Sequence, residues 1–246
     1  MARTAREARR LAGAKVLEAP VISHHHRCIY FHVPKTGGQS IERLFLDDLG
    51  LSWEQRAPLL LGANENRKVG PPRLAHMTAD EIIAFRYIPE RMLGEYFCFA
   101  TVRNPWSRVV SAFRYITSHA RFEEFVDDRI RDGGRFAWFL RPQTDFYYRN
   151  GESVCDQVIR LENLKDGAAG LISRFDLSSQ LGHVNSSGEA LKVGARFKNA
   201  VKHTAETGAA LEDHSDWREF FTPRTRAIVE AYYARDIDVL GYEFDD

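Results

Sequence analysis

The stretch CIYFHVPKTGGQSIERLFL, residues 28–46, decides the fold. Its first six residues are apolar or aromatic apart from one histidine, which is typical of a buried strand. The segment PKTGGQS breaks that pattern, and Ile41, Leu44 and Phe45 then follow at helical spacing. The sequence therefore predicts a strand, a glycine-containing loop and a helix in direct succession.

A second copy of the same unit lies at EYFCFATVRNPWSRVVSAFRYI, residues 95–116. The apolar run ends at Arg103, and Asn104 is a suitable N-cap for a helix with Pro105 at its first position. Strands that alternate with helices favour a largely parallel sheet covered on both faces. We expect an α/β fold with a central parallel sheet flanked by helices.

Local signals place the other elements. Thr78 and Glu81 have the spacing of a capping box, so a short helix is expected to begin there. Residues 122–134 indicate a helix closed by two glycines, and Thr222 with Pro223 indicates the start of another. Residues 153–161 form a third apolar run, which supplies a further strand.

Composition limits the domain organisation. The chain has 246 residues, of which 44% are hydrophobic, which suits one globular domain. We expect a basic helical arm over residues 1–20 and a single domain over residues 21–246. No stretch approaches the eighteen or so apolar residues of a membrane span, so a soluble protein is expected.

Charge and cysteine content limit the partners and the compartment. The 34 Lys and Arg residues balance 34 Asp and Glu residues, which argues against a dedicated nucleic-acid binder. Any anion site must therefore be local. The three cysteines lack disulfide or metal-ligand spacing and are interpreted as thiols of a cytoplasmic protein. The oligomeric state cannot be inferred from these features.

The loop HVPKTGGQSIE, residues 32–42, has the chemistry of an anion site. Its glycines allow the backbone to approach an anion, the helix that follows presents free N–H groups, and Lys35 adds a charge. Because the lysine precedes the glycines, the pattern is not the Walker pattern GxxxxGK(S/T) of magnesium-dependent nucleoside triphosphatases. The alternative is a plain turn in which Thr36 and Gln39 form a capping box.

The second unit supplies another strand-to-helix connection that could bind an anion, with Arg103 at the end of the strand and Ser111 eight residues later. Parallel α/β sheets bind ligands beyond the carboxyl ends of their strands. One ligand with two separated phosphate-like groups could therefore reach both strand-to-helix connections. The alternative is that Arg103 bonds a carbonyl and that Arg108 and Arg114 are solvated helix charges, which is the preferred interpretation for Arg108.

These motifs resemble the sulfotransferases that use 3′-phosphoadenosine 5′-phosphosulfate (PAPS), particularly carbohydrate sulfotransferases and their bacterial relatives. HVPKTGGQSIERLF is similar to that family's 5′-phosphosulfate loop, and TVRNPWSRVVSAFRY to its 3′-phosphate element. The likeness continues through RPQTDFYY (141–148), LENL (161–164), HVNSS (183–187) and WREFFTP to DIDVLGYEF at the end. The Gly-Gly-Gln in the loop departs from the usual family pattern.

The resemblance implies a P-loop-like sulfotransferase fold and sulfuryl transfer from PAPS to an acceptor hydroxyl, with adenosine 3′,5′-bisphosphate as product and without a metal. It implies that Lys35 is catalytic and that His76 is the base that deprotonates the acceptor. It further implies a donor-binding set made of Pro34, Lys35, Thr36, Gly37, Gly38, Gln39, Ser40, Arg103 and Ser111. A glycan or glycoconjugate is the expected acceptor. A small-molecule kinase and a non-catalytic binder of adenosine bisphosphate are the alternatives.

Other residues have open interpretations. The run His24–His26 could bind metal, but a solvated run is preferred because consecutive residues point in alternate directions. His32 is interpreted as a satisfied core or cleft histidine. Glu162 either orients a site residue or caps a helix with Asn163. The aromatic stretch at Tyr147 and Tyr148 is interpreted as core, with an acceptor pocket as the alternative.

Overall fold

A mostly parallel sheet forms the centre of the molecule. The computed structural model describes residues 21–55, 76–116, 119–133, 137–178 and 210–246, so the expected arm and the HVNSS segment lie outside the described residues. The strands follow the order β1-β2-β3-β6, with β1 antiparallel and the others parallel: β1 (Val21–Ser23), β2 (Cys28–Phe31), β3 (Phe97–Val102) and β6 (Gln157–Arg160). The expected α/β fold is confirmed, and the antiparallel edge strand is an addition.

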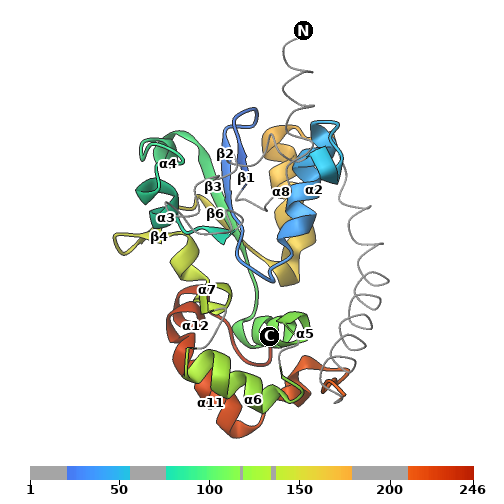
Figure 1. Ribbon diagram of the computed structural model, residues 1–246. Helices are drawn as coiled ribbons and strands as arrows, with labels where there is room; N and C mark the ends of the chain where they lie inside the picture. The colour runs from blue at the N-terminus through green and yellow to red at the C-terminus, as the bar shows by residue number, and fades with distance from the viewer. Residues whose placement is uncertain (1–20, 56–75, 117–118, 134–136, 179–209) are drawn as a thin grey trace.

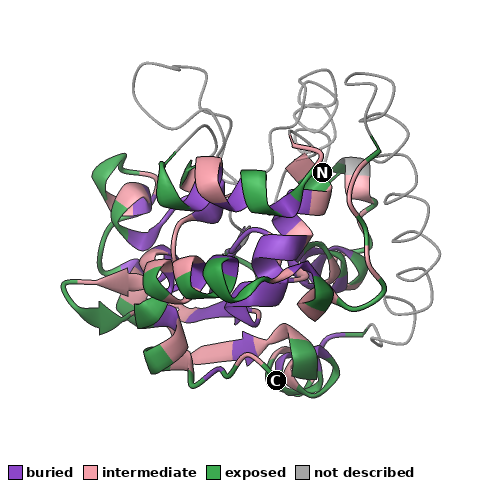
Figure 2. Ribbon diagram, turned by 90° about the horizontal axis from the view of Figure 1, so that it is seen from below, coloured by how far each residue is buried: buried purple, intermediate pink, exposed green. Residues whose placement is uncertain are grey.

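Strand alternation divides the core between the two faces of the sheet. In β2, Tyr30 packs with Phe99 on one face, whereas Ile29 and Phe31 join the cluster on the other. The first face is covered by α2 (Gly38–Asp48) and α8 (Leu164–Phe175), and α3 (Ala79–Ala84) and α4 (Met92–Glu95) lie on the other side (Figure 1). Figure 2 shows that buried residues follow the strands and the inward faces of these helices.

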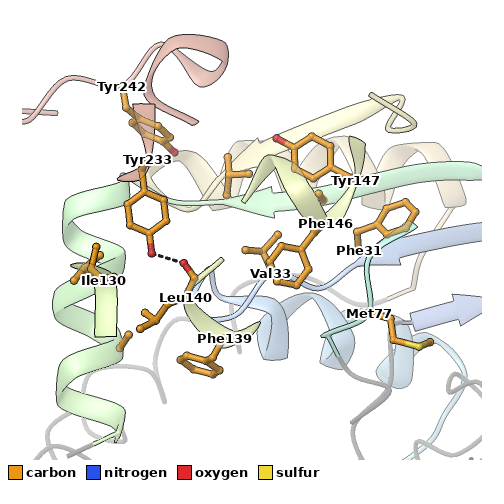
Figure 3. Packing of buried hydrophobic residues seen from close by; sticks show 14 of the residues in the cluster. Phe31, Val33, Met77, Ile130, Phe139, Leu140, Phe146, Tyr147, Tyr233 and Tyr242 are labelled. Carbon is orange, nitrogen blue, oxygen red and sulfur yellow. Dashed lines mark hydrogen bonds between the residues drawn. The ribbon is translucent and has the colours of Figure 1, made fainter. Parts of the chain in front are cut away.

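The remaining helices gather beyond one end of the sheet (Figure 1). They are α5 (Pro105–Ile116), α6 (Phe122–Val126) with its π-helical continuation (Asp127–Arg131), α7 (Ala137–Leu140), α11 (Pro223–Tyr232) and α12 (Ala234–Leu240). A small hairpin, β4 (Tyr148–Arg149) with β5 (Glu152–Ser153), lies at the side. Tyr233 points towards α7 and donates a hydrogen bond to the carbonyl of Leu140 (Figure 3). No helix of the described residues is long and apolar enough to cross a membrane.

The local helix signals are confirmed where the structure describes them. Thr78 and Glu81 form a complete capping box at α3, and the side chain of Asn104 accepts from the N–H groups of the first turn of α5. Thr222 caps α11, with Pro223 at its first position. These caps work within four residues, so sequence alone suffices to predict them.

The connection from β2 to α2 requires glycine for a steric reason. A Cβ atom on Gly38 would lie 2.1 Å from Nε2 of His32, and the His32 ring is held in place by a 2.7 Å hydrogen bond between its Nδ1 and Glu42. The ring therefore cannot move aside without losing that bond. His32 is buried and bonded, which confirms its interpretation as a satisfied histidine.

We predict that Gly38→Ala destabilises the protein because the new methyl group overlaps the His32 ring. Overpacking of this kind costs about 1–3 kcal/mol. Thermal unfolding followed by circular dichroism should show a lower midpoint than in the unchanged protein. Gly94→Ala is the matched control, since a Cβ atom there meets nothing within 4 Å. Equal midpoints for Gly38→Ala and Gly94→Ala would show that His32 does not confine the loop.

Candidate donor-binding site

The loop between β2 and α2 leaves the start of α2 open. Gly37 is the N-cap in a left-handed conformation (φ 84°), and no side chain caps the first turn among the described residues. The alternative capping box of Thr36 and Gln39 is therefore wrong. The N–H of Ser40 donates to the Gly37 carbonyl (2.9 Å), and the other N–H groups of this turn lie beyond the carboxyl end of β2, where they favour an anion.

The Thr36 side chain has an internal role. Its hydroxyl donates to the carbonyl of Val33 (2.8 Å) and lies 2.7 Å from Oγ1 of Thr101, which is 2.6 Å from the Tyr30 hydroxyl. Thr36 is fully buried, so only its main chain is left for a ligand. Along the same turn, Gln39 is exposed and Ser40 is half-buried.

Lys35 occupies the centre of this loop with a left-handed backbone (φ 69°). Its Nζ lies 4.4 Å from the centre of the Tyr115 ring, and it forms no ion pair within the described residues. Burial and, to a smaller extent, the charge of Arg103 lower the pKa of Lys35 to about 8. The lysine is therefore a cation that an incoming anion would stabilise.

Arg103 follows β3 and provides the second cation. Its Nε donates to Oγ of Ser107 (2.7 Å), whereas its two terminal nitrogens have no partner among the described residues. Burial lowers the pKa of Arg103 to about 10, despite the opposing effect of Glu162. Ser111 is half-buried on α5. A guanidinium with two unused nitrogens suits a phosphate group.

The main chain of Arg103 is clamped by the side-chain amide of Gln143. The N–H of Arg103 donates to Gln143 (2.9 Å), and the Gln143 amide donates back to the Arg103 carbonyl (2.8 Å). Buried Asp236 accepts from the N–H groups of Gln143 (2.6 Å) and Thr144 (2.9 Å) and from the Thr144 hydroxyl (2.7 Å). The RPQTDF and DIDVLGYEF segments therefore hold the main chain of Arg103 together, a role that the sequence analysis did not identify.

Glu162 orients the neighbouring residue. One carboxylate oxygen accepts from the N–H of Asn104 (2.8 Å) and the other from the Tyr242 hydroxyl (2.9 Å). Asn163 makes no side-chain cap at α8. The capping interpretation is therefore wrong, and Glu162 instead holds the main chain of Asn104, the residue next to Arg103.

The structure corrects the interpretation of Arg108 and Arg114 as solvated charges. Arg108 is 1% exposed, and it donates to the main-chain carbonyls of three residues, namely Pro34, Phe139 and Arg141. Arg114 bonds Asp213 (2.9 Å) and the carbonyl of His214 (2.6 Å). Sequence reasoning missed both because the partners lie 31 to 100 residues away.

His76 lies at the same edge of the sheet as the loop. Its Nδ1 is 2.8 Å from the carbonyl oxygen of His32, and because a carbonyl can only accept, Nδ1 carries the proton. The neutral ring then has its lone pair on Nε2. The ring stacks on Trp138 and packs nearly perpendicular to the ring of Phe139, which in turn stacks on Tyr115. Lys35 and His76 thus contact one continuous series of aromatic rings.

The other predicted features do not join this group. Tyr147 is buried in the core, where its hydroxyl has no hydrogen-bond partner, and Tyr148 is half-buried, so the core interpretation is confirmed for Tyr147. Figure 3 shows Tyr147 among the core side chains.

The histidine run is only partly solvated. His26 is packed against Phe45, and its ring nitrogens lie 2.6 Å from the Ser23 hydroxyl and 2.9 Å from Asp48. Hydrogen bonds from Ser178 and then His26 hold the pKa of Asp48 below its usual range. Ligand atoms of His25, His26 and Asp48 do lie within 4.8 Å of one another. Because both nitrogens of His26 are already engaged, we assign it to the β1-β2 turn.

Comparison with known proteins agrees with this geometry. The model of the sulfotransferase family matches residues 19–243, which is most of the chain. The chain belongs to the sulfotransferase family. No individual curated protein matches it. Because members of this family are enzymes that use PAPS, the chain is a PAPS-dependent sulfotransferase rather than a kinase or a non-catalytic binder.

The described residues of this sulfotransferase fit a donor that carries two phosphate groups. The uncapped start of α2 and the unused nitrogens of Arg103 supply donors at two adjacent strand ends. Lys35 and Arg103 follow adjacent parallel strands, and the charge of Arg103 adds to the effect of burial in lowering the pKa of Lys35.

We predict that the affinity for adenosine 3′,5′-bisphosphate falls as pH rises through 8. Lys35 binds the anion in its charged form, and its pKa of about 8 means that alkaline pH removes that charge. Between pH 7 and pH 9 the affinity should drop about tenfold. Over this range the phosphates stay ionised and Arg103, with a pKa of about 10, stays charged. Calorimetry at stepped pH measures the slope, and Lys35→Met should abolish it. A slope that persists in Lys35→Met would assign the titration to another group.

We also predict that Arg103 selects the 3′-phosphate. The unchanged protein should bind adenosine 3′,5′-bisphosphate more tightly than AMP. Arg103→Ala should lower the ratio of the two affinities by about tenfold to a hundredfold. Arg43→Ala is the control, because Arg43 is exposed on α2. Equal calorimetric affinities of the unchanged protein for both nucleotides would contradict the role of Arg103.

Proposed function

We propose that this sulfotransferase moves a sulfuryl group from PAPS to a hydroxyl of a carbohydrate or glycoconjugate. The observation that carries the proposal is the pair Lys35 and Arg103, two partly buried cations at adjacent strand ends. Neither forms an ion pair within the part of the chain that the structure describes. Burying a charge without a partner is costly, so such a pair is best explained by an anionic ligand.

The donor would lie along the edge of the sheet. Lys35 would contact the bridging oxygen and the sulfuryl group, and Arg103 with Ser111 would hold the 3′-phosphate. The 5′-phosphate would be bound by a segment whose contributions are mostly main-chain N–H groups, with the Ser40 hydroxyl: Pro34, Thr36, Gly37, Gly38, Gln39 and Ser40. The buried Thr36 hydroxyl supports a main-chain role at that position.

The chemistry asks little covalent work of the protein, by analogy with phosphoryl transfer. Lys35 and the start of α2 neutralise charge on the leaving oxygen, and His76 removes the acceptor proton at Nε2. The hydrogen bond from Nδ1 of His76 to the His32 carbonyl supports that tautomer. Because His32 also contacts Gly38, the base and the loop are supported by the same residue. We propose that the reaction needs no metal.

The aromatic rings beside His76 support a carbohydrate acceptor. Tyr115 is 54% exposed, its ring is parallel to that of Phe139, and Trp138 stacks on His76. An acceptor held between Lys35 and His76 would contact these rings, and the apolar C–H face of a sugar ring suits such a surface. We further propose that residues 21–246 act as one domain in the cytoplasm, a compartment that suits the three free cysteines.

We predict that the protein transfers labelled sulfate from PAPS to pyranosides in a panel that also holds acyclic polyols and phenols. On the best acceptor, His76→Ala should lower turnover by about a hundredfold or more, because the base acts only in the chemical step. Its affinity for adenosine 3′,5′-bisphosphate should stay near that of the unchanged protein. Transfer rates and calorimetry provide the two measurements.

Different results would contradict the acceptor class and the role of His76. Transfer only to phenols would overturn the carbohydrate acceptor, whereas transfer at full rate by His76→Ala would remove the base from that position. A lower melting temperature with normal activity per folded molecule would assign His76 a packing role.

A further inference from the structure

Arg108 has an unusual environment for a charged residue. It is almost fully buried on α5, and each of its three guanidinium nitrogens donates to a main-chain carbonyl: Nε to Pro34, Nη1 to Arg141 and Nη2 to Phe139, each at 3.0 Å. Within the described residues it has no carboxylate partner. A buried guanidinium without a counter-ion is costly, so its presence here calls for an explanation other than stability alone.

The bond to Pro34 acts on the backbone of Lys35. The Pro34 carbonyl and the Lys35 nitrogen belong to the same planar peptide group. A hydrogen bond that fixes this carbonyl therefore fixes the orientation of the peptide that leads into Lys35. Lys35 has φ 69°, a left-handed value that is uncommon for a residue with a side chain. On the other side of Lys35, the Thr36 hydroxyl bonds the Val33 carbonyl. Lys35 is thus held between two fixed neighbours.

The other two bonds of Arg108 reach the segment that supports the rest of the site. The ring of Phe139 packs nearly perpendicular to that of His76, and Arg141 comes two residues before Gln143, which clamps Arg103. The planar guanidinium fixes these carbonyls relative to the Pro34 carbonyl. A lysine at position 108 would keep the charge but lose the planar fork.

We propose that Arg108 is a positioning residue that holds Lys35 in its left-handed conformation. It also fixes the position of the donor loop, the β2–α2 connection over residues 32–37, relative to residues 139–141. Arg108 touches neither substrate in this proposal. It rests on the proposed function in one respect, namely that Lys35 contacts the donor.

The test compares Arg108→Lys with the unchanged protein in calorimetry with adenosine 3′,5′-bisphosphate and AMP. If Arg108 positions Lys35, the tenfold loss of affinity between pH 7 and pH 9 should shrink to less than about twofold, because Lys35 no longer reaches the anion. The preference for the 3′-phosphorylated nucleotide should stay within about threefold, since Arg103 keeps its own clamp. General loosening of the fold would reduce both the pH dependence of the affinity and the preference for the 3′-phosphorylated nucleotide.

A double-mutant cycle tests the same coupling. Arg108→Lys should weaken nucleotide binding at pH 7 in the unchanged protein, but should add little when Lys35→Ala is already present. Equal losses in both backgrounds would overturn the proposal. Arg114→Lys is the matched control on the same helix, since Arg114 bonds Asp213 and the His214 carbonyl instead, and it should leave the pH slope intact.

Two further outcomes keep the proposal separate from the proposed function. If Arg108→Lys does not fold, Arg108→Gln, which can still donate to one carbonyl, takes its place in the same comparison. If the unchanged protein shows no pH slope and no 3′-phosphate preference, the proposed function fails. If it shows both and the Arg108 variant keeps the full slope, only the role of Arg108 is overturned.

Discussion

The burial of two cations, Lys35 and Arg103, without an ion-pair partner among the described residues is the constraint on which the rest of the site depends. The two cations lie at the ends of adjacent parallel strands, and the charge of Arg103 contributes to the low pKa of Lys35. Like charges in a partly buried site separate unless the backbone that carries them is fixed. The buried carboxylate of Asp236 and the Gln143 amide fix one of these backbones, and Arg108 with Thr36 fixes the other.

The same need for rigidity explains the crowding around the donor loop. His32 is bonded to Glu42, its ring occupies the space that a side chain at Gly38 would need, and its carbonyl accepts from His76. One histidine therefore supports both the helix start and the proposed base. A positioning error of about 1 Å in a catalytic site can cost a hundredfold in rate, so close packing of this kind would serve the proposed chemistry.

Sequence patterns predict the parts of this protein that depend on local interactions. The caps at Thr78 and Asn104 and the two strand-loop-helix units depend on residues within a few positions of each other. The chemistry of the donor loop could also be inferred, because Lys35 and its glycines are adjacent. The partners of Arg108 and Gln143 lie 31 to 93 residues away, and only the folded chain shows them. The interpretation of Arg108 as a solvated charge is wrong for this reason, since an arginine inside an amphipathic helix is usually exposed.

The choice of hydrogen-bond acceptors follows from the charge that the site must keep. Arg108 is bound by neutral carbonyls and the Nε of Arg103 by a neutral hydroxyl, so neither cation is cancelled by a direct ion pair within the described residues. The nearby carboxylates of Asp236 and Glu162 accept from main-chain N–H groups instead, which orients the site. A carboxylate bonded to Arg108 would stabilise that side chain but weaken the positive potential available to an anionic donor. The chain can therefore be neutral overall and still hold a local positive site, because Asp236 and Glu162 bond the main chain around Arg103 rather than pairing with its guanidinium.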